Sequence, residues 1–150
     1  MNHFIEKLFL KKYFDDFSSL IDTSDDLMDE LLKFTQAIKD VCSKGNKAII
    51  CGNGGSAAIA SHFSVDVTKN AGLRCINFNE SDLITCFAND YGFDHWISNA
   101  IRLYGDEGDI FIGISSSGKS KDIINGCSQA RKSKFSSVIT FSGFEEDNPL

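Results

Sequence analysis

The feature that most constrains the fold is the regular alternation of short apolar runs with longer amphipathic segments between residues 47 and 141. The apolar runs predict buried parallel strands at 47–51, 74–78, 109–114 and 136–141. Helices are expected between them at 57–69, 81–88, 91–103 and 119–132, with the middle two separated at Asn89 and Asp90. This order predicts an α/β fold with a doubly wound parallel sheet, which binds ligands at the carboxyl ends of its strands. Only residues 143–150 follow the last strand, so the C-terminal end is expected to be short for such a fold.

Two helices are expected to precede the first strand. Apolar residues at helical spacing predict the first over residues 2–21. The second is predicted to begin at Thr23, Ser24 and Asp25, to carry an apolar stripe from Leu27 to Val41, and to end at Gly45. We therefore expect N-terminal helices in residues 1–45 and a ligand-binding region in residues 46–150, within a single domain overall. Two helices outside the core leave apolar surface uncovered, which predicts that residues 1–45 mediate homo-oligomerisation.

The charge and cysteine content narrow the possible partners and location. The chain has 15 basic and 21 acidic residues, a net charge of −6, which argues against a nucleic-acid partner. The five cysteines are scattered and include no C-x-x-C pair, as is typical of reduced thiols in a cytoplasmic protein. No apolar run approaches the roughly 18 residues that a membrane helix needs, so no membrane partner is expected.

A glycine-rich turn follows the first expected strand and reads Gly52-Asn53-Gly54-Gly55-Ser56. Glycines allow the backbone to approach a ligand closely, and Ser56 can cap the next helix or bind an oxyanion. With Ala57 the turn also satisfies the dinucleotide-binding pattern, but that pattern needs an acidic residue at the end of the next strand. Glu80 comes too late for this role, so no nucleotide cofactor is expected. A plain strand–helix turn remains the structural alternative.

A second loop follows the third expected strand and reads Ser115-Ser116-Ser117-Gly118-Lys119-Ser120. Together with Gly113 it matches the P-loop expression of nucleotide-binding proteins letter for letter. A P-loop enzyme also needs an Asp at the end of a second strand, whereas the other expected strands end at Cys51, Phe78 and Phe141. Four hydroxyls and the free N–H groups of a helix start instead favour the terminal phosphate of a sugar. An ordinary polar loop with a helix cap is the alternative.

Four motifs occur in a fixed order along the chain: residues 51–56, His62-Phe63, residues 88–92 and residues 113–118. From the second helix to its end, the chain resembles the sugar isomerase (SIS) domain family, and more narrowly the phosphoheptose isomerases. The resemblance implies a flavodoxin-like three-layer sandwich. It also implies that the protein isomerises sedoheptulose 7-phosphate to a heptose 7-phosphate through an enediolate, for surface heptose synthesis. The implied substrate contacts are Asn53, Gly54, Gly55, Ser56, Asn89, Asp90, Ser115, Ser116, Ser117 and Ser120. Lys119 departs from the Asn that is usual in the family.

His62 and Asp66 lie four residues apart on the expected helix after the first loop, so they share a face. The resemblance implies that both bind a metal, with zinc possible, and that Asp66 is also the catalytic base. Glu is the family residue at position 66, and the family draws a further Gln and His from a C-terminal region that these residues do not include. Two ligands fall short of the three or four of a zinc site. A solvated pair within the helix is the alternative.

Two function hypotheses from different classes remain. The first is a phosphosugar isomerase. The second is a non-catalytic SIS module that senses a phosphosugar or docks a protein such as the replication initiator, and Asp66 in place of Glu favours it. The resemblance further implies a homotetramer, in which neighbouring chains complete each site; dihedral symmetry is common for four identical chains. The expected partners are therefore a sugar phosphate and further copies of this chain.

Overall fold

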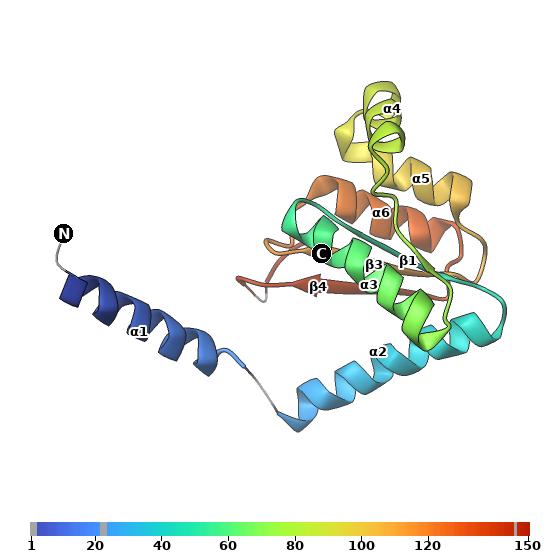
Figure 1. Cartoon of the computed structure of the whole chain (residues 1–150). Coiled ribbons are helices and arrows are strands. Elements are labelled where there is room, and N and C mark those ends of the chain that lie inside the picture. Colours follow the sequence, from blue (N-terminus) through green and yellow to red (C-terminus); the bar gives the residue numbers. More distant parts are fainter. Residues whose placement is uncertain (1–2, 22–23, 146) are drawn as a thin grey trace. The chain divides into compact units, whose positions relative to one another are not determined.

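The computed structural model describes residues 3–21, 24–145 and 147–150 of the chain. They form two compact units, residues 1–34 and 35–150, and the division falls within the second helix. Figure 1 shows the succession of elements along the chain. Thr23, one of the three residues expected to begin the second helix, lies outside the described residues.

The first unit contains helix α1, His3–Ser19, and the beginning of α2, Asp25–Ser43. Ser24 caps α2, because its Oγ accepts a hydrogen bond from the backbone N–H of Leu27 at 3.3 Å. Helix α1 buries none of its side chains. Its exposed apolar residues are Phe4, Ile5, Leu8, Phe9, Leu10, Tyr13, Phe14 and Phe17. The helix therefore presents a large apolar surface.

The second unit is built on a parallel sheet of four strands in the order β2-β1-β3-β4. The strands are β1 Ala48–Gly52, β2 Cys75–Ile76, β3 Ile110–Ser115 and β4 Ser137–Ser142. This is the flavodoxin-like order, in which the chain moves outward from the centre in both directions. The predicted doubly wound parallel sheet is therefore confirmed.

Helices cover both faces of this sheet. Helix α3, Gly55–Ala71, connects β1 to β2, whereas α6, Lys121–Lys132, connects β3 to β4 in the opposite direction. Because such crossovers are right-handed, the two helices lie on opposite faces, as Figure 1 shows. Helix α5, Trp96–Tyr104, lies beside α6.

The core alternates along the central strands. Ile49 and Cys51 of β1 and Phe111 of β3 belong to one buried cluster with residues of α5 and α6. Successive side chains of a strand point to opposite faces, so Ile50 and Ile112 face the other layer. All five side chains are at most 2% exposed. Continuous burial of the central strands follows from helices on both faces.

Strand β2 is much shorter than the predicted run over 74–78, which was wrong in its length. The chain leaves the sheet at Asn77, whose Nδ2 donates a hydrogen bond to Ser64 Oγ at 2.7 Å. Two residues later, Asn79 Nδ2 donates to the Ala57 carbonyl oxygen at 2.8 Å. These contacts with α3 replace the ladder bonds that a longer strand would make.

The helical break expected at Asn89 and Asp90 is also misplaced. Helix α4, Ser81–Tyr91, continues through both residues and ends at Gly92. Gly92 has a φ of 81°, a left-handed conformation that suits glycine, and a short 3-10 helix, Phe93–His95, leads from it into α5. The predicted position of the break was therefore wrong, because the glycine that follows α4, and not Asn89 or Asp90, ends the helix.

A buried ion pair closes the amino end of the sheet. Lys47 Nζ lies 2.7 Å from Asp109 Oδ2 and 2.6 Å from Asp106 Oδ2, and Asp109 is fully buried. Burial by itself would raise the pKa of Asp109, but hydrogen bonds from Asp106, Lys47 and Asn46 together outweigh it and hold this pKa below its usual value. Burial would lower the pKa of Lys47, yet its two carboxylate partners raise it. The pair is therefore stabilised in its charged form.

Candidate functional site

The two predicted loops enclose one cavity at the carboxyl ends of the two central strands. We call it the serine cavity; its volume is about 230 Å³. It is lined by Asn53, Ser56, Ile114, Ser115, Ser116, Ser117, Ser120 and Phe144. The fold thus brings together six of the ten predicted substrate-contacting residues. Gly54 and Gly55 are not in this lining and lie at the start of α3.

The first loop turns sharply into α3. Gly54 is the residue before the helix and has a φ of 54°, while the backbone N–H of Ser56 donates to the Asn53 carbonyl oxygen at 2.9 Å. Gly52 must lack a side chain, because a Cβ there would lie 2.7 Å from Ser56. No side chain caps α3, so of the two roles considered for Ser56, helix capping is not observed. Its side chain lines the serine cavity instead.

The second loop folds around a network of hydroxyls. The Ser115 hydroxyl donates to Ser120 Oγ at 3.0 Å, and Ser117 Oγ accepts from the backbone N–H of Lys119 at 3.2 Å. Gly118, with a φ of 64°, closes the turn through its N–H bond to the Ser115 carbonyl oxygen at 2.9 Å. Helix α6 begins at Lys121, two residues later than predicted, and the Ser120 side chain makes no capping bond. This helix start can present its first N–H groups to an anion.

The lysine of the P-loop pattern does not line the serine cavity. Its Nζ lies 3.7 Å from Glu145 Oε2, and its side chain is 61% exposed. A P-loop lysine reaches the phosphates that its loop surrounds. The geometry of Lys119 is therefore that of a surface ion pair.

Asp122 is the residue of this region that the sequence analysis missed. Its two carboxylate oxygens accept hydrogen bonds from Asn53 Nδ2 at 3.0 and 2.9 Å, although 69 residues separate the two in the chain. Asp122 is 3% exposed and lies in the first turn of α6. It joins the two loops at the serine cavity. No sequence signal distinguishes it from the many acidic residues that begin helices.

His62 and Asp66 form an exposed pair on α3, with Nε2 and Oδ2 3.3 Å apart. They line a separate hollow of about 430 Å³ with Ala58, Ile59 and Phe63. Among residues 3–21, 24–145 and 147–150, no three His, Cys, Asp or Glu side chains gather closely enough to hold a metal ion. A zinc site needs three or four ligands, so the donors of this chain do not by themselves fit the zinc that the resemblance implies.

Asn89 and Asp90 lie in the last turn of α4, where Asn89 Nδ2 donates to Asp90 Oδ1 at 3.0 Å. Both side chains are exposed. Neither lines the serine cavity. Within one chain, the structure therefore does not bring these two predicted substrate contacts to the serine cavity.

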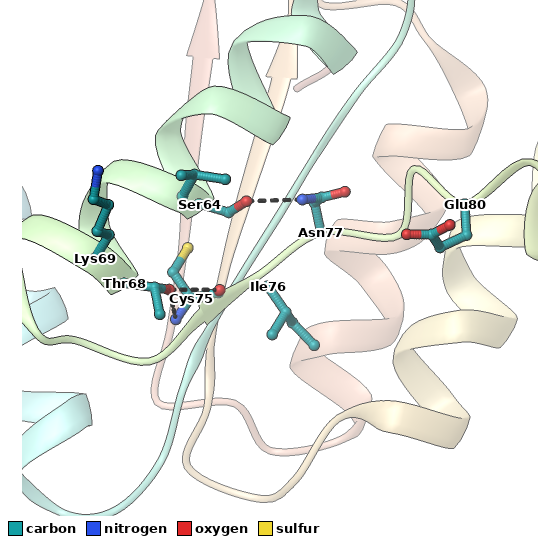
Figure 2. Close-up of a pocket in the computed structure, with 8 residues that line it drawn as sticks. Ser64, Thr68, Lys69, Cys75, Ile76, Asn77 and Glu80 are labelled. Atoms are coloured by element: carbon teal, nitrogen blue, oxygen red, sulfur yellow. Dashed lines mark hydrogen bonds between the residues drawn. The ribbon is translucent and has the colours of Figure 1, made fainter.

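A further hollow of about 410 Å³ borders the outer edge of β2. Figure 2 shows two pairs among its polar groups: Thr68 with the backbone of Cys75, and Ser64 with Asn77. The Thr68 hydroxyl donates to the Cys75 carbonyl oxygen at 3.0 Å and accepts from its N–H at 3.2 Å. The Thr68 hydroxyl therefore pairs with backbone groups of β2, which is an edge strand, and unpaired groups at a sheet edge can pair with another strand.

The amino-acid sequence matches a known family model. The sequence model of the SIS domain matches residues 12–143, which is most of the chain. The chain belongs to the SIS domain family. The family resemblance drawn from four short motifs is therefore confirmed.

Individual SIS relatives agree with this family. The chain is 42% identical to a phosphoheptose isomerase from Fusobacterium nucleatum, over 68% of this chain and 55% of the relative. It is 35% identical to one from Yersinia enterocolitica, over 79% of this chain and 64% of the relative. The chain thus spans between a half and two thirds of the length of these two relatives.

A solved structure has the same fold. A phosphoheptose isomerase from Francisella tularensis superimposes with a TM-score of 0.84 at 26% identity, covering 97% of this chain and 78% of the other.

In the part of the chain that the structure describes, no helix is both long and apolar enough to cross a membrane.

Proposed function

We propose that this SIS protein is a phosphosugar isomerase that converts sedoheptulose 7-phosphate into a heptose 7-phosphate through an enediolate. The observation that carries the proposal is the serine cavity, where hydroxyls from both loops surround one space at the carboxyl ends of the strands. Relatives named phosphoheptose isomerase support the same chemistry. We place the reaction in the cytoplasm, where its product would feed surface heptose synthesis.

The phosphate binds in the serine cavity. Hydroxyls of Ser116, Ser117 and Ser120 donate to its oxygens, and the start of α6 contributes backbone N–H groups and the positive end of the helix dipole. The Ser115 hydroxyl, which also lines the cavity, donates to Ser120 Oγ and holds that side chain in place. Each such bond to a charged group is worth about 1.5–3 kcal/mol. A neutral cradle of this kind explains how an acidic protein, of net charge −6, can hold an anion.

Asp66 is the base that moves the proton between C1 and C2. In a ketose 7-phosphate these carbons lie at the opposite end of the molecule from the phosphate, so the base must be remote from the phosphate loops. Along α3, Asp66 lies ten residues beyond Ser56 and outside the lining of the serine cavity. The neighbouring His62, 3.3 Å from Asp66, can hold the carboxylate in place and share its proton.

The sugar end of the site is completed by a second copy of the chain, in a homo-oligomer that we propose to be a tetramer. Ile59 and Val65 flank the His62–Asp66 pair and are 59% and 54% exposed. Apolar side chains on that face, and the uncovered apolar surface of α1, favour contact with other chains. A symmetric assembly would also cover functional side chains such as Asp90, which one chain leaves exposed.

The proposal is tested by measuring turnover and binding of sedoheptulose 7-phosphate. Replacing Ser117 and Ser120 with Ala should weaken binding at least about 100-fold, because two hydrogen bonds to the phosphate are lost. Ser128→Ala is the matched control, since Ser128 is exposed on α6 and outside the serine cavity. Calorimetry that gave the same affinity for the double variant and the control would contradict the proposed phosphate site.

The oligomer is tested on α1. Replacing Phe14 and Phe17, which are 62% and 56% exposed, with Ser should reduce the molar mass measured by light scattering. The residues are not buried in the chain itself, so the fold of residues 35–150 should be retained. Lys7 and Lys11 replaced with Ala on the same helix form the control. A wild-type monomer, or a phenylalanine variant with unchanged mass, would argue against this interface.

A further inference from the structure

We propose that Asp122 is a positioning residue: it fixes the Asn53 side-chain amide so that its carbonyl oxygen, not its NH₂ group, faces the ligand in the serine cavity. This inference rests on the proposed function and refines the ligand class of that site. It begins from the contact between the two loops, in which both oxygens of Asp122 lie within 3.0 Å of Asn53 Nδ2.

The carboxylate decides the orientation of the amide. An ionised carboxylate can only accept hydrogen bonds, so it selects the NH₂ end of Asn53 and excludes the carbonyl end. Asp122 is itself held in place, being 3% exposed in the first turn of α6, where the helix dipole stabilises its negative charge. A flipped amide would place two acceptors against each other. Asn53 therefore has one orientation.

The consequence concerns the other end of the amide. Asn53 lines the serine cavity and is only partly buried, and no described residue donates a hydrogen bond to its Oδ1. This oxygen is an acceptor, so it repels phosphate oxygens and pairs with a hydroxyl donor. The two loops thus bind different groups of one ligand: the serines bind the phosphate, and Asn53 binds a hydroxyl near it. The ligand class is a polyol phosphate.

Asp122 also carries a charge beside an anion site. A buried negative charge in contact with a residue of the cavity lowers the affinity for any phosphate, including inorganic phosphate. The same residue raises the affinity for a hydroxyl-bearing ligand through Asn53. Asp122 therefore favours a sugar phosphate over free phosphate, and its removal should lower the ratio of the sugar phosphate affinity to the inorganic phosphate affinity.

The test is calorimetry on the full chain with two probes, sedoheptulose 7-phosphate and inorganic phosphate. Asp122→Ala should lower the ratio of the sugar phosphate affinity to the inorganic phosphate affinity about tenfold, the value of one hydrogen bond. Asp122→Asn offers Asn53 a donor as well as an acceptor and no longer selects one orientation, so it should give a ratio between those of Asp122→Ala and the wild type. A purely structural role predicts that both affinities fall together, and that result would overturn the assignment.

A double-mutant cycle shows whether Asp122 acts through Asn53. Asn53→Ala should reduce the affinity ratio as Asp122→Ala does, and the double variant should be no worse than Asn53→Ala, within about twofold. Additive losses would overturn the proposal. A wild-type chain that bound neither probe would overturn the proposed function as well, whereas wild-type binding with an unaltered ratio in Asp122→Ala would overturn only the role of Asp122.

The charge can also be moved without breaking the contact, which keeps the proposal testable if Asp122→Ala fails to fold. In the double variant Asn53→Asp/Asp122→Asn, the amide introduced at position 122 can donate to the carboxylate introduced at position 53. Thermal stability should stay near that of the wild type, but sugar phosphate affinity should fall at least about tenfold because a carboxylate now faces the cavity. Retained affinity in this stable variant would refute the proposal.

Discussion

The two ends of the parallel sheet in residues 35–150 differ in how they use polar groups. At the amino end, the Asp109 carboxylate is fully buried and accepts hydrogen bonds from Lys47, Asn46 and the Asp106 backbone. At the carboxyl end, hydroxyls surround an open space of about 230 Å³. Polar groups at the amino end are paired within the protein, whereas those at the carboxyl end keep capacity for a ligand.

The contrast has a physical origin. The carboxyl ends of parallel strands meet the starts of the following helices, where backbone N–H groups have no partner in the helix. Pairing all of them internally would leave nothing with which to bind an anion. The amino end has no such task, so a charged pair there can be buried and fully satisfied. Variants at the amino end should therefore change stability, and those at the carboxyl end should change binding.

The largest expected effect is on stability at the amino end. Asp109→Ala leaves Lys47 and several N–H groups buried without their acceptor, so the free energy of unfolding should fall by about 3–5 kcal/mol. Urea unfolding followed by circular dichroism measures this loss. Asp106→Ala removes the exposed partner of the same lysine and should cost about 1 kcal/mol or less. Equal losses in the two variants would contradict the proposed importance of burial.

The same ion pair should make stability depend on pH at both extremes. The pKa of Asp109 is lowered by folding, so its contribution is present above the unfolded value of about 3.9 and is lost as the pH falls through the folded pKa. The pKa of Lys47 is raised, so its contribution is present below about 10.4 and is lost as the pH rises through the folded pKa. Urea midpoints across pH should fall less steeply at low pH in Asp109→Asn, and a slope equal to that of the wild type would argue against this pair.

The smallest expected effect is at the carboxyl end, at the lysine of the P-loop pattern. Lys119→Asn should leave phosphosugar affinity within about threefold of wild type, because the side chain makes only an exposed ion pair outside the serine cavity. ATP with Mg²⁺ should bind weakly or not at all before and after the change. Fluorescence titration with a labelled nucleotide provides the measurement. Micromolar, Mg²⁺-dependent binding that disappears in the variant would instead identify a nucleotide site.

Sequence patterns located the central strands well because their burial on both faces produces continuous apolar runs. Strands β1, β3 and β4 each begin one residue later than predicted. Lys47 and Asp109 immediately precede β1 and β3. The apolar residues of each predicted run therefore form the strand, and the charged residue at its start lies just before the strand. Strand β2 was predicted too long because Asn77 pairs with Ser64 of α3, and a local pattern does not contain such a contact.

By itself, the sequence determined the α/β class, the parallel sheet, the two loops of the serine cavity and the SIS family. These depend on local features: apolar periodicity, glycines that permit a tight turn, and motifs of a few consecutive residues. Only the tertiary structure decided that Asp122 holds Asn53, that Lys47 pairs with Asp109, and that His62 and Asp66 line a separate hollow. The residues of the first two pairs are 69 and 62 positions apart in the chain. Their pairing follows from strand order and crossover direction, because only the folded sheet brings the ends of distant strands together.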